Sequence, residues 1–112
     1  MDNQEMIITE GVSLVEAMEQ LDYSPEKVLF VVREDKLVAA LSDGDIRRWI
    51  VANGDINAKV AQIANYSPKY LVLEDEVYAH EYISQYDLKA IPVLDNNKKI
   101  LKIVTRSQNS PA

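Results

Sequence analysis

The feature that most constrains this chain is that its second half repeats the pattern of its first half. A shift of 62 positions aligns apolar residues of the two halves, and the aligned pairs are Val15 and Val77, Ala17 and Ala79, Leu21 and Ile83, Val28 and Ala90, Val31 and Val93, and Val32 and Leu94. One extra residue in the turn 95–99 changes the shift to 63, and Leu37, Leu41 and Ser42 then align with Ile100, Val104 and Thr105. We therefore expect an internal duplication of a strand–helix–strand–strand–helix unit of roughly 50 residues.

The repeat gives a first copy at residues 5–55, a second at 56–108 and a tail at 109–112. A unit this small does not readily bury its own sheet, so we expect the two copies to pack through their sheets with pseudo-twofold symmetry and a cleft between them. The sequence after Thr105 is polar and ends in Pro111-Ala112, so the last helix of the second copy is expected to be cut short.

Hydrophobic periodicity predicts the individual elements. In the first copy they are a short strand at 7–9, a helix capped by Ser13 with Glu16 in the capping-box position, a strand at 28–32 covered on both faces, a charged turn at 33–36, a strand at 37–41, and a helix at 43–53 that buries Ile46, Trp49 and Ile50 and ends at Gly54. A linker at 55–68 contains a helical turn near 60–64, and a helix of the second copy opens on Glu74, Asp75 and Glu76.

Composition argues against several classes of partner. The net charge is −6, from 12 basic and 18 acidic residues, and basic residues gather only in the pairs 47–48 and 98–99, so we expect no nucleic-acid binding. The sequence has no cysteine, which removes disulfides and thiolate chemistry and favours a reducing cytoplasm. No apolar run approaches the ~18 residues of a membrane span, and the polar start is not a secretory signal. We expect a cytoplasmic protein that does not bind membranes.

The junction between the strand at 37–41 and the following helix can be interpreted in two ways. Ser42 followed by Asp45 is the pattern of a capping box, in which the serine hydroxyl and the acid satisfy the start of a helix. The same junction points several backbone N–H groups at one spot, beside a hydroxyl and carboxylates, where the ribose and phosphate of a nucleotide can be held. The two interpretations stay open on these residues alone.

A family likeness bears on that choice. The segment 37–48, Leu-Val-Ala-Ala-Leu-Ser-Asp-Gly-Asp-Ile-Arg-Arg, resembles the TDGDIRR form of cystathionine-β-synthase-type (CBS) regulatory domains that precede sugar-phosphate nucleotidyltransferase domains. Ile91-Pro92-Val93-Leu94-Asp95 resembles the hydrophobic-Pro-Val-Val-Asp strand of the same family. The resemblance covers about residues 5 to 108 and implies an α/β (α+β) fold, a tandem pair of CBS-type βαββα repeats known as a Bateman module.

The resemblance also implies a ligand and its site. Such modules bind adenosine nucleotides or related adenosyl ligands, so AMP, ADP or ATP is expected without any required cofactor or metal. Asp45 would accept hydrogen bonds from the ribose hydroxyls, and Ser42 with the helix N-terminus would meet the phosphate. The implied nucleotide-binding residues are Ile8, Ser42, Asp43, Asp45, Arg47, Arg48 and Thr105.

Three departures from the family pattern predict one good site per chain. Ala39 and Ala40 stand where the family often has glycine, which narrows the pocket. In the second copy Gln108 replaces the aspartate and Lys102 replaces the glycine, so we expect a degenerate second site.

Other residues carry weaker signals. His80 is the only histidine and is expected to be a partly buried helix residue, because no second metal ligand or triad partner stands near it. Tyr78, Tyr82 and Tyr86 are spaced by four and share one helical face, which can stack on an adenine, contact a second copy or simply pack on the neighbouring repeat.

These observations predict a noncatalytic regulatory module that binds an adenosine-type nucleotide, forms a homodimer through helix faces that include Trp49, and controls a C-terminal nucleotidyltransferase domain. The alternative is a ligand-free structural dimerisation module, which Ala40 and Gln108 favour. A small enzyme is a third interpretation, and the sequence lacks the catalytic groups it requires.

Overall fold

The structure is a computed structural model that describes residues 4–106. The chain divides into two compact units, unit 1 at Met1–Pro68 and unit 2 at Lys69–Ala112. The predicted shortened last helix, Gln108 and the tail at 109–112 lie outside the described residues. Within residues 4–106 no helix combines the length and apolar character needed to cross a membrane.

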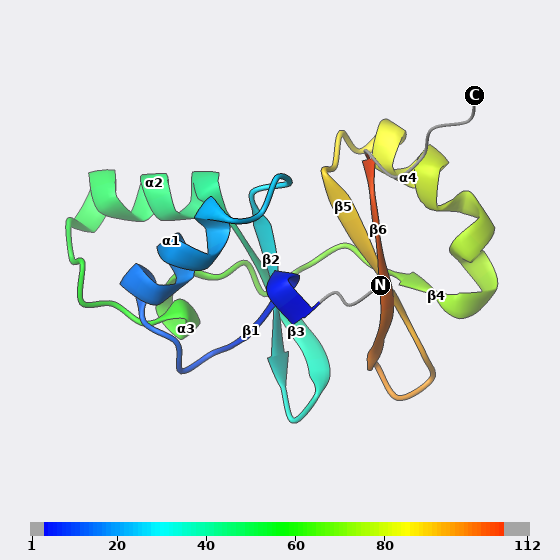
Figure 1. Cartoon of the computed structure of the whole chain (residues 1–112), viewed down its shortest axis with the longest axis horizontal. Coiled ribbons are helices and arrows are strands. Elements are labelled where there is room, and N and C mark those ends of the chain that lie inside the picture. Colours follow the sequence, from blue (N-terminus) through cyan, green and yellow to red (C-terminus); the bar gives the residue numbers. More distant parts are fainter. Residues whose placement is uncertain (1–3, 107–112) are drawn as a thin grey trace. The chain divides into compact units, whose positions relative to one another are not determined.

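Unit 1 is a three-stranded sheet with helices (Figure 1). Its elements are the 3-10 helix η1 (Gln4–Met6), β1 (Ile7–Thr9), α1 (Leu14–Asp22), β2 (Val28–Arg33), β3 (Lys36–Ser42), α2 (Asp43–Asn53) and α3 (Val60–Ile63). The strand order is β1-β2-β3, with β1 parallel and β3 antiparallel to β2. The charged turn is tighter than expected, because Glu34 and Asp35 alone connect β2 to β3 with φ angles of 52° and 67°. Two residues of positive φ match the twist of an antiparallel pair.

The core of unit 1 lies between its sheet and the helices α1 and α2, which cover one face (Figure 1). The fully buried members include Leu14, Leu29 and Leu41. The prediction that α2 buries Ile50 is wrong, since this side chain is 41% exposed. α2 reaches the core through Ile46 and, partly, Trp49, and its later turns extend past the sheet.

The segment between α2 and unit 2 forms hydrogen bonds with the rest of unit 1 along its length. The Leu14 N–H donates to the Ala58 carbonyl at 2.9 Å, and the Val60 N–H donates to Val12 at 2.8 Å. Asn65 then forms a bridge with Ala40 on the outer side of β3. The helical turn predicted in this linker is confirmed as α3. The boundary between copies at residues 55 and 56 stays a prediction.

Unit 2 has the same arrangement of strands. Its elements are β4 (Leu71–Val72), the 3-10 helix η2 (Leu73–Tyr78), α4 (Ala79–Gln85), β5 (Ala90–Leu94) and β6 (Ile100–Thr105). β5 is central, parallel to β4 and antiparallel to β6. The expected helix opening at Glu74 is a 3-10 segment, and the α-helix begins only at Ala79. Val72 stands at the N-cap of the 3-10 segment, and its apolar side chain cannot cap an α-helix there.

The strand pairing in the two units confirms the duplication. Val28 pairs with Ser42 in unit 1, and Ala90 pairs with Thr105 in unit 2, as the shifts of 62 and 63 require. Each hairpin also has one irregularity of register, between Val31 and Val32 and at the matching place between Val93 and Leu94. A repeated β-bulge is a feature of the fold and not a local defect.

Candidate functional site

Ser42 and Asp45 form the capping box that the sequence predicts. Ser42 ends β3 in an extended conformation and is the N-cap of α2. The Asp45 N–H donates to Ser42 Oγ at 3.2 Å, and Asp45 Oδ2 accepts from the Ser42 N–H at 2.9 Å and from Ser42 Oγ at 3.0 Å. The carboxylate is therefore already bound to the helix start through one of its two oxygens.

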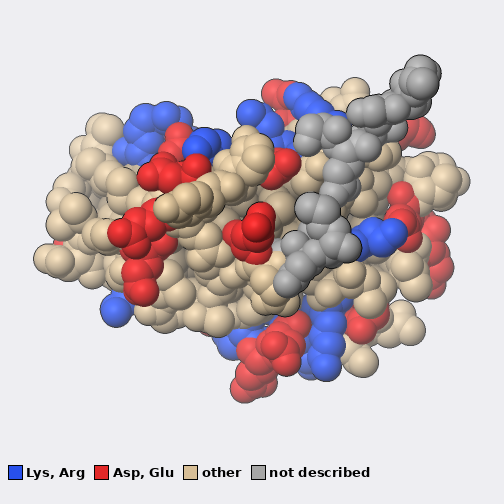
Figure 2. Space-filling view, in the orientation of Figure 1, with Lys and Arg blue, Asp and Glu red and all other residues tan. Residues whose placement is uncertain are grey.

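Two arginines surround the same helix start. Arg48 Nη2 lies 2.7 Å from Asp45 Oδ1, and Arg47 Nη1 lies 3.8 Å from Asp43 Oδ2. A methyl group added to Gly44 would lie 3.3 Å from Arg48 Nη1, 3.7 Å from Ser42 Oγ and 3.8 Å from an Nη atom of Arg47. Basic side chains accordingly lie beside acidic ones over α2 in Figure 2. The hydroxyl and two guanidinium groups converge on the surface of Gly44, a composition that suits an anion.

Fewer backbone donors are available here than the sequence predicts. The Asp43 N–H donates to the Lys27 carbonyl at 3.2 Å, and the Asp45 N–H is used by Ser42. Of the first three amides of α2, at most that of Gly44 can meet a ligand without a rearrangement. An anion at this position would depend on side chains more than on the helix backbone. Sequence reasoning missed the carbonyl of Lys27, because nothing in a loop sequence marks which carbonyl turns toward a helix.

The other predicted site residues lie elsewhere. Ile8 is 5% exposed and belongs to the core cluster of unit 1. Thr105 is 5% exposed and ends β6 in unit 2. Ala40 exchanges backbone hydrogen bonds with Asn65, and Ala39 is fully buried. The structure brings together Ser42, Asp43, Gly44, Asp45, Arg47 and Arg48, all on α2 or at its start.

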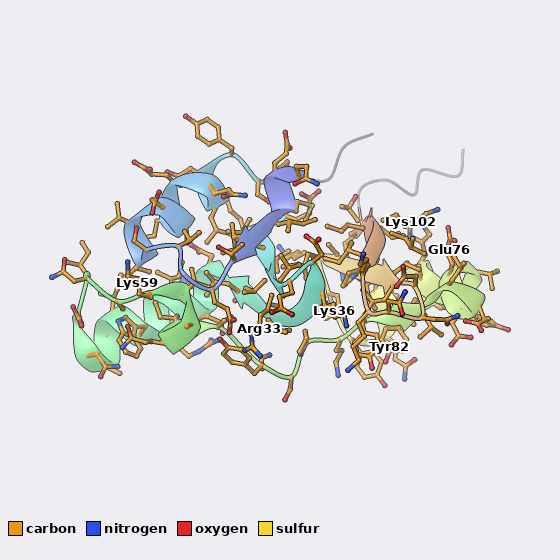
Figure 3. The ribbon with its side chains drawn as sticks, turned by 90° about the horizontal axis from the view of Figure 1, so that it is seen from below. Arg33, Lys36, Lys59, Glu76, Tyr82 and Lys102 are labelled. Carbon is orange, nitrogen blue, oxygen red and sulfur yellow. The ribbon has the colours of Figure 1, made fainter. Side chains whose placement is uncertain are left out.

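A second polar cluster joins three distant parts of unit 1. Arg33, labelled in Figure 3, contacts Glu10 with two hydrogen bonds of 2.7 and 2.8 Å. The Tyr66 hydroxyl donates to Glu10 Oε2 at 2.6 Å. We name Glu10, Arg33 and Tyr66 the clasp. No sequence signal predicts it, because its members lie 23 and 56 positions apart.

The clasp holds the strongest electrostatic perturbation of the described residues. Hydrogen bonds from Arg33 and Tyr66 lower the pKa of Glu10 from 4.5 to about 2. The Glu10 carboxylate in turn raises the pKa of the Arg33 guanidinium and of the Tyr66 hydroxyl. The hydrogen bonds that cause these shifts favour the charged form of Glu10 and hold Tyr66 of the linker against Glu10. The three side chains of the clasp bind one another and join distant parts of unit 1, so we assign it a structural role.

The tyrosine face predicted in the second half is formed in part. The rings of Tyr82 and Tyr86 lie 4.7 Å apart between centroids, and Lys69 Nζ lies 4.4 Å from the centroid of Tyr86. Tyr78 belongs to η2 and is exposed. His80 is half-buried on α4, as expected. Figure 3 shows Glu76 and Lys102 close together in unit 2, where they form an ion pair.

Comparison with known proteins identifies the fold of the chain through similar solved structures. No protein-family model matches the sequence, and no curated protein matches it. Among solved structures, the cytosolic domain of the Mg²⁺ channel MgtE in complex with ATP is 28% identical, with a TM-score of 0.70 over 91% of this chain and 42% of that chain. The chain thus spans less than half of that structure.

Two further structures match most of both chains. The CBS domain protein PAE2072 from Pyrobaculum aerophilum complexed with AMP is 19% identical, with a TM-score of 0.74 over 89% of this chain and 79% of that chain. The CBS domain pair of MJ0100, in complex with 5′-methylthioadenosine and S-adenosyl-L-methionine, is 23% identical, with a TM-score of 0.73 over 91% and 85%. The prediction of a mixed α+β fold of CBS-domain pairs is confirmed.

Proposed function

We propose that the chain is a regulatory module that binds an adenosine-type nucleotide at the start of α2 in unit 1. The observation that carries the proposal is the convergence of Asp45, Ser42 and two arginines around Gly44. Solved structures of the same fold hold ATP, AMP or S-adenosyl-L-methionine, which supports a ligand of this class.

Each group has a role that its chemistry fits. The Asp45 carboxylate only accepts hydrogen bonds and suits the ribose hydroxyls, which donate them. Ser42 and the two arginines suit a phosphate, because the hydroxyl and the guanidinium groups donate hydrogen bonds to it. The guanidinium groups also supply local positive charge in a chain whose net charge is −6. The proposal needs no metal and no catalytic group, so the module acts through binding alone.

The proposed output is control of an enzyme. Binding at α2 favours one conformation of the module over others, and a joined enzyme that senses this conformation changes its activity. The likeness of segment 37–48 to the TDGDIRR form makes a C-terminal sugar-phosphate nucleotidyltransferase domain the proposed target, with the module as a homodimer in the cytoplasm. Ile8 and Thr105 remain proposed ligand contacts on the family pattern alone.

A ligand-free structural module is the second candidate. It is favoured by one observation, that the capping box and the amides of Asp43 and Asp45 have partners without any ligand. In that case Ser42 and Asp45 serve only to begin the helix, and the chain contributes a dimerisation surface.

Thermal unfolding against a panel of adenosine nucleotides separates the two candidates. A ligand at about a hundred times its Kd adds roughly 2.7 kcal/mol of stability if it binds only the folded chain. We expect AMP, ADP or ATP to raise the Tm of the wild type by several degrees. The shift should disappear in Asp45→Asn and persist in Glu16→Gln, which changes the equivalent acid of the capping box of α1.

The contrary outcome is equally clear. If no adenosine ligand raises the Tm, while the chain still dimerises in a concentration-dependent way, the nucleotide proposal fails and the structural module remains. A Tm shift of equal size in Asp45→Asn also contradicts the assigned site.

A further inference from the structure

The hydrogen bonds of Asp45 leave too few acceptor positions for a ribose. A carboxylate offers about four lone-pair sites to donors. In this structure Oδ2 accepts from the Ser42 N–H and from Ser42 Oγ, and Oδ1 accepts from Arg48 Nη2. Three of the four sites are occupied. A ribose that donates both its 2′ and 3′ hydroxyls to Asp45 needs two.

One of the three existing bonds must therefore break when a ribose binds. The two bonds from Ser42 belong to the capping box, are partly buried and hold the start of α2. The side chain of Arg48 is 74% exposed, and exposed ion pairs contribute little to stability. The bond from Arg48 is therefore the one that costs a ligand the least free energy to displace.

We infer that Arg48 competes internally for the ribose-binding oxygen of Asp45 and thereby sets which ligands the site accepts. The inference rests on the proposed nucleotide function and assigns its specificity. While Arg48 stays on Asp45, one free acceptor site serves a 2′-deoxyribose as well as a ribose. When Arg48 leaves, the site accepts both hydroxyls and distinguishes ribose from deoxyribose.

The geometry gives Arg48 a second position to move to. Its Nη1 already lies 3.3 Å from the place of a methyl group on Gly44, where Ser42 Oγ and Arg47 also converge. A phosphate bound there supplies the guanidinium with a new anionic partner. This exchange of partners couples phosphate binding to ribose binding. The phosphate attracts the Arg48 guanidinium away from Asp45, and the Asp45 oxygen is then free to accept from the ribose. A phosphorylated nucleoside is the class of ligand that releases the block.

Arg47 provides a matched control. It has the same side chain on the same helix, and it also lies near Gly44. Its carboxylate partner is Asp43, at 3.8 Å, and not Asp45. Replacing Arg47 removes positive charge from the phosphate position but leaves the acceptor sites of Asp45 unchanged.

The test is a set of isothermal titrations with adenosine, 2′-deoxyadenosine and AMP on the wild type, Arg48→Met and Arg47→Met. In Arg48→Met we expect adenosine to bind about 2- to 5-fold more tightly than in the wild type, because it no longer displaces an ion pair. Binding of 2′-deoxyadenosine should change by less than about 2-fold, so the ribose-to-deoxyribose preference rises. The gain in affinity from adenosine to AMP should fall about 10-fold, because the guanidinium is missing from the phosphate position.

Arg47→Met should weaken AMP binding without changing the ratio of adenosine to 2′-deoxyadenosine affinity. If AMP binds the wild type and is lost in Asp45→Asn, but this ratio is the same in Arg48→Met and the wild type, the role of Arg48 is wrong and the nucleotide function stands. If neither AMP nor adenosine binds any of the three proteins, the nucleotide function itself fails. Both variants change exposed side chains, and a thermal scan confirms that each is folded.

Discussion

The chain uses the same capping box twice in unit 1, and the two copies differ in what surrounds them. In α1, Ser13 and Glu16 exchange hydrogen bonds of 3.1 to 3.4 Å at an exposed position. In α2, Ser42 and Asp45 do the same at 2.9 to 3.2 Å in a partly buried position. The backbones are also alike, since the first amide of each helix donates to a carbonyl of another segment, Ala58 in one case and Lys27 in the other.

The difference lies in the charges next to the acid. Asp45 has Arg48 at 2.7 Å and a second arginine nearby, whereas Glu16 has the capping partner Ser13. A capping box is thus sufficient to begin a helix, and α1 demonstrates it within the same unit. The arginines at α2 are additional to that requirement, and the additional charge is what suggests a ligand.

The largest expected effect tests whether packing, and not capping, holds both helices. Leu14 lies within the first box, directly after Ser13, and is fully buried, and Ile46 follows the second box and is 3% exposed. We expect Leu14→Ala and Ile46→Ala each to lower the free energy of unfolding by about 2–5 kcal/mol, through lost burial and a residual cavity. Urea denaturation measures both. Losses below about 1 kcal/mol would show that the helices dock on the sheet less tightly than their burial indicates.

A smaller effect compares the caps directly. Ser13→Ala and Ser42→Ala each remove the hydroxyl that accepts from the third helical amide, and such changes cost about 0.5–2 kcal/mol. We expect the larger loss for Ser42→Ala, because its box is partly buried and its removal leaves Asp45 with fewer donors. Equal urea midpoints for the two variants would contradict a difference in burial between the boxes.

The clasp is expected to differ from both capping boxes in how its contribution to stability depends on pH. The pKa of Glu10 in the folded chain, about 2, lies below its ordinary 4.5, so the folded state holds this carboxylate in its charged form. The stability it contributes is fully present above about pH 4.5 and is lost as the pH falls toward 2. We expect the Tm difference between the wild type and Glu10→Gln to shrink over this range. A difference that stays constant from pH 5 to about 2 would contradict the pKa shift.

The smallest effect concerns Arg48 itself. Because its side chain is 74% exposed, Arg48→Met should lower the free energy of unfolding by less than about 1 kcal/mol, and this loss should diminish in 1 M NaCl. Denaturation at low and high salt measures it, with Arg47→Met as the control. A loss above about 2 kcal/mol would make Arg48 a structural residue of α2 and weaken its role in ligand selection.

Patterns that are local in sequence were sufficient for most of the fold. Both capping boxes, the left-handed Gly54 that ends α2 and the paired strands follow from residues within a few positions of each other. The duplication was visible because both copies keep the same apolar register. The prediction for Ile50 failed because periodicity tells which face of a helix is apolar, but not how far the sheet beneath it extends.

The sequence predicted which residues form the candidate site, but it did not predict all of their hydrogen-bond partners. The sequence indicated Ser42, Asp45 and the arginines as neighbours on one helix turn. It did not indicate that Asp45 also binds Arg48 or that the Asp43 amide already has a partner, since these bonds depend on a rotamer and on a carbonyl from a loop. The sequence did not predict the clasp for a related reason. Contacts between residues that are far apart in the sequence produce no periodic pattern.

The segment 58–66 has a consequence for how the chain is made. Its backbone supplies partners to Leu14, Val12 and Ala40, and its last residue, Tyr66, closes the clasp on Glu10, 56 positions earlier. During synthesis the ribosome must release residue 66 before unit 1 can complete these contacts. Until then the backbone groups of Leu14, Val12 and Ala40 lack these partners. Assembly of unit 1 therefore finishes only after its last residues have left the ribosome, when little of unit 2 has yet emerged.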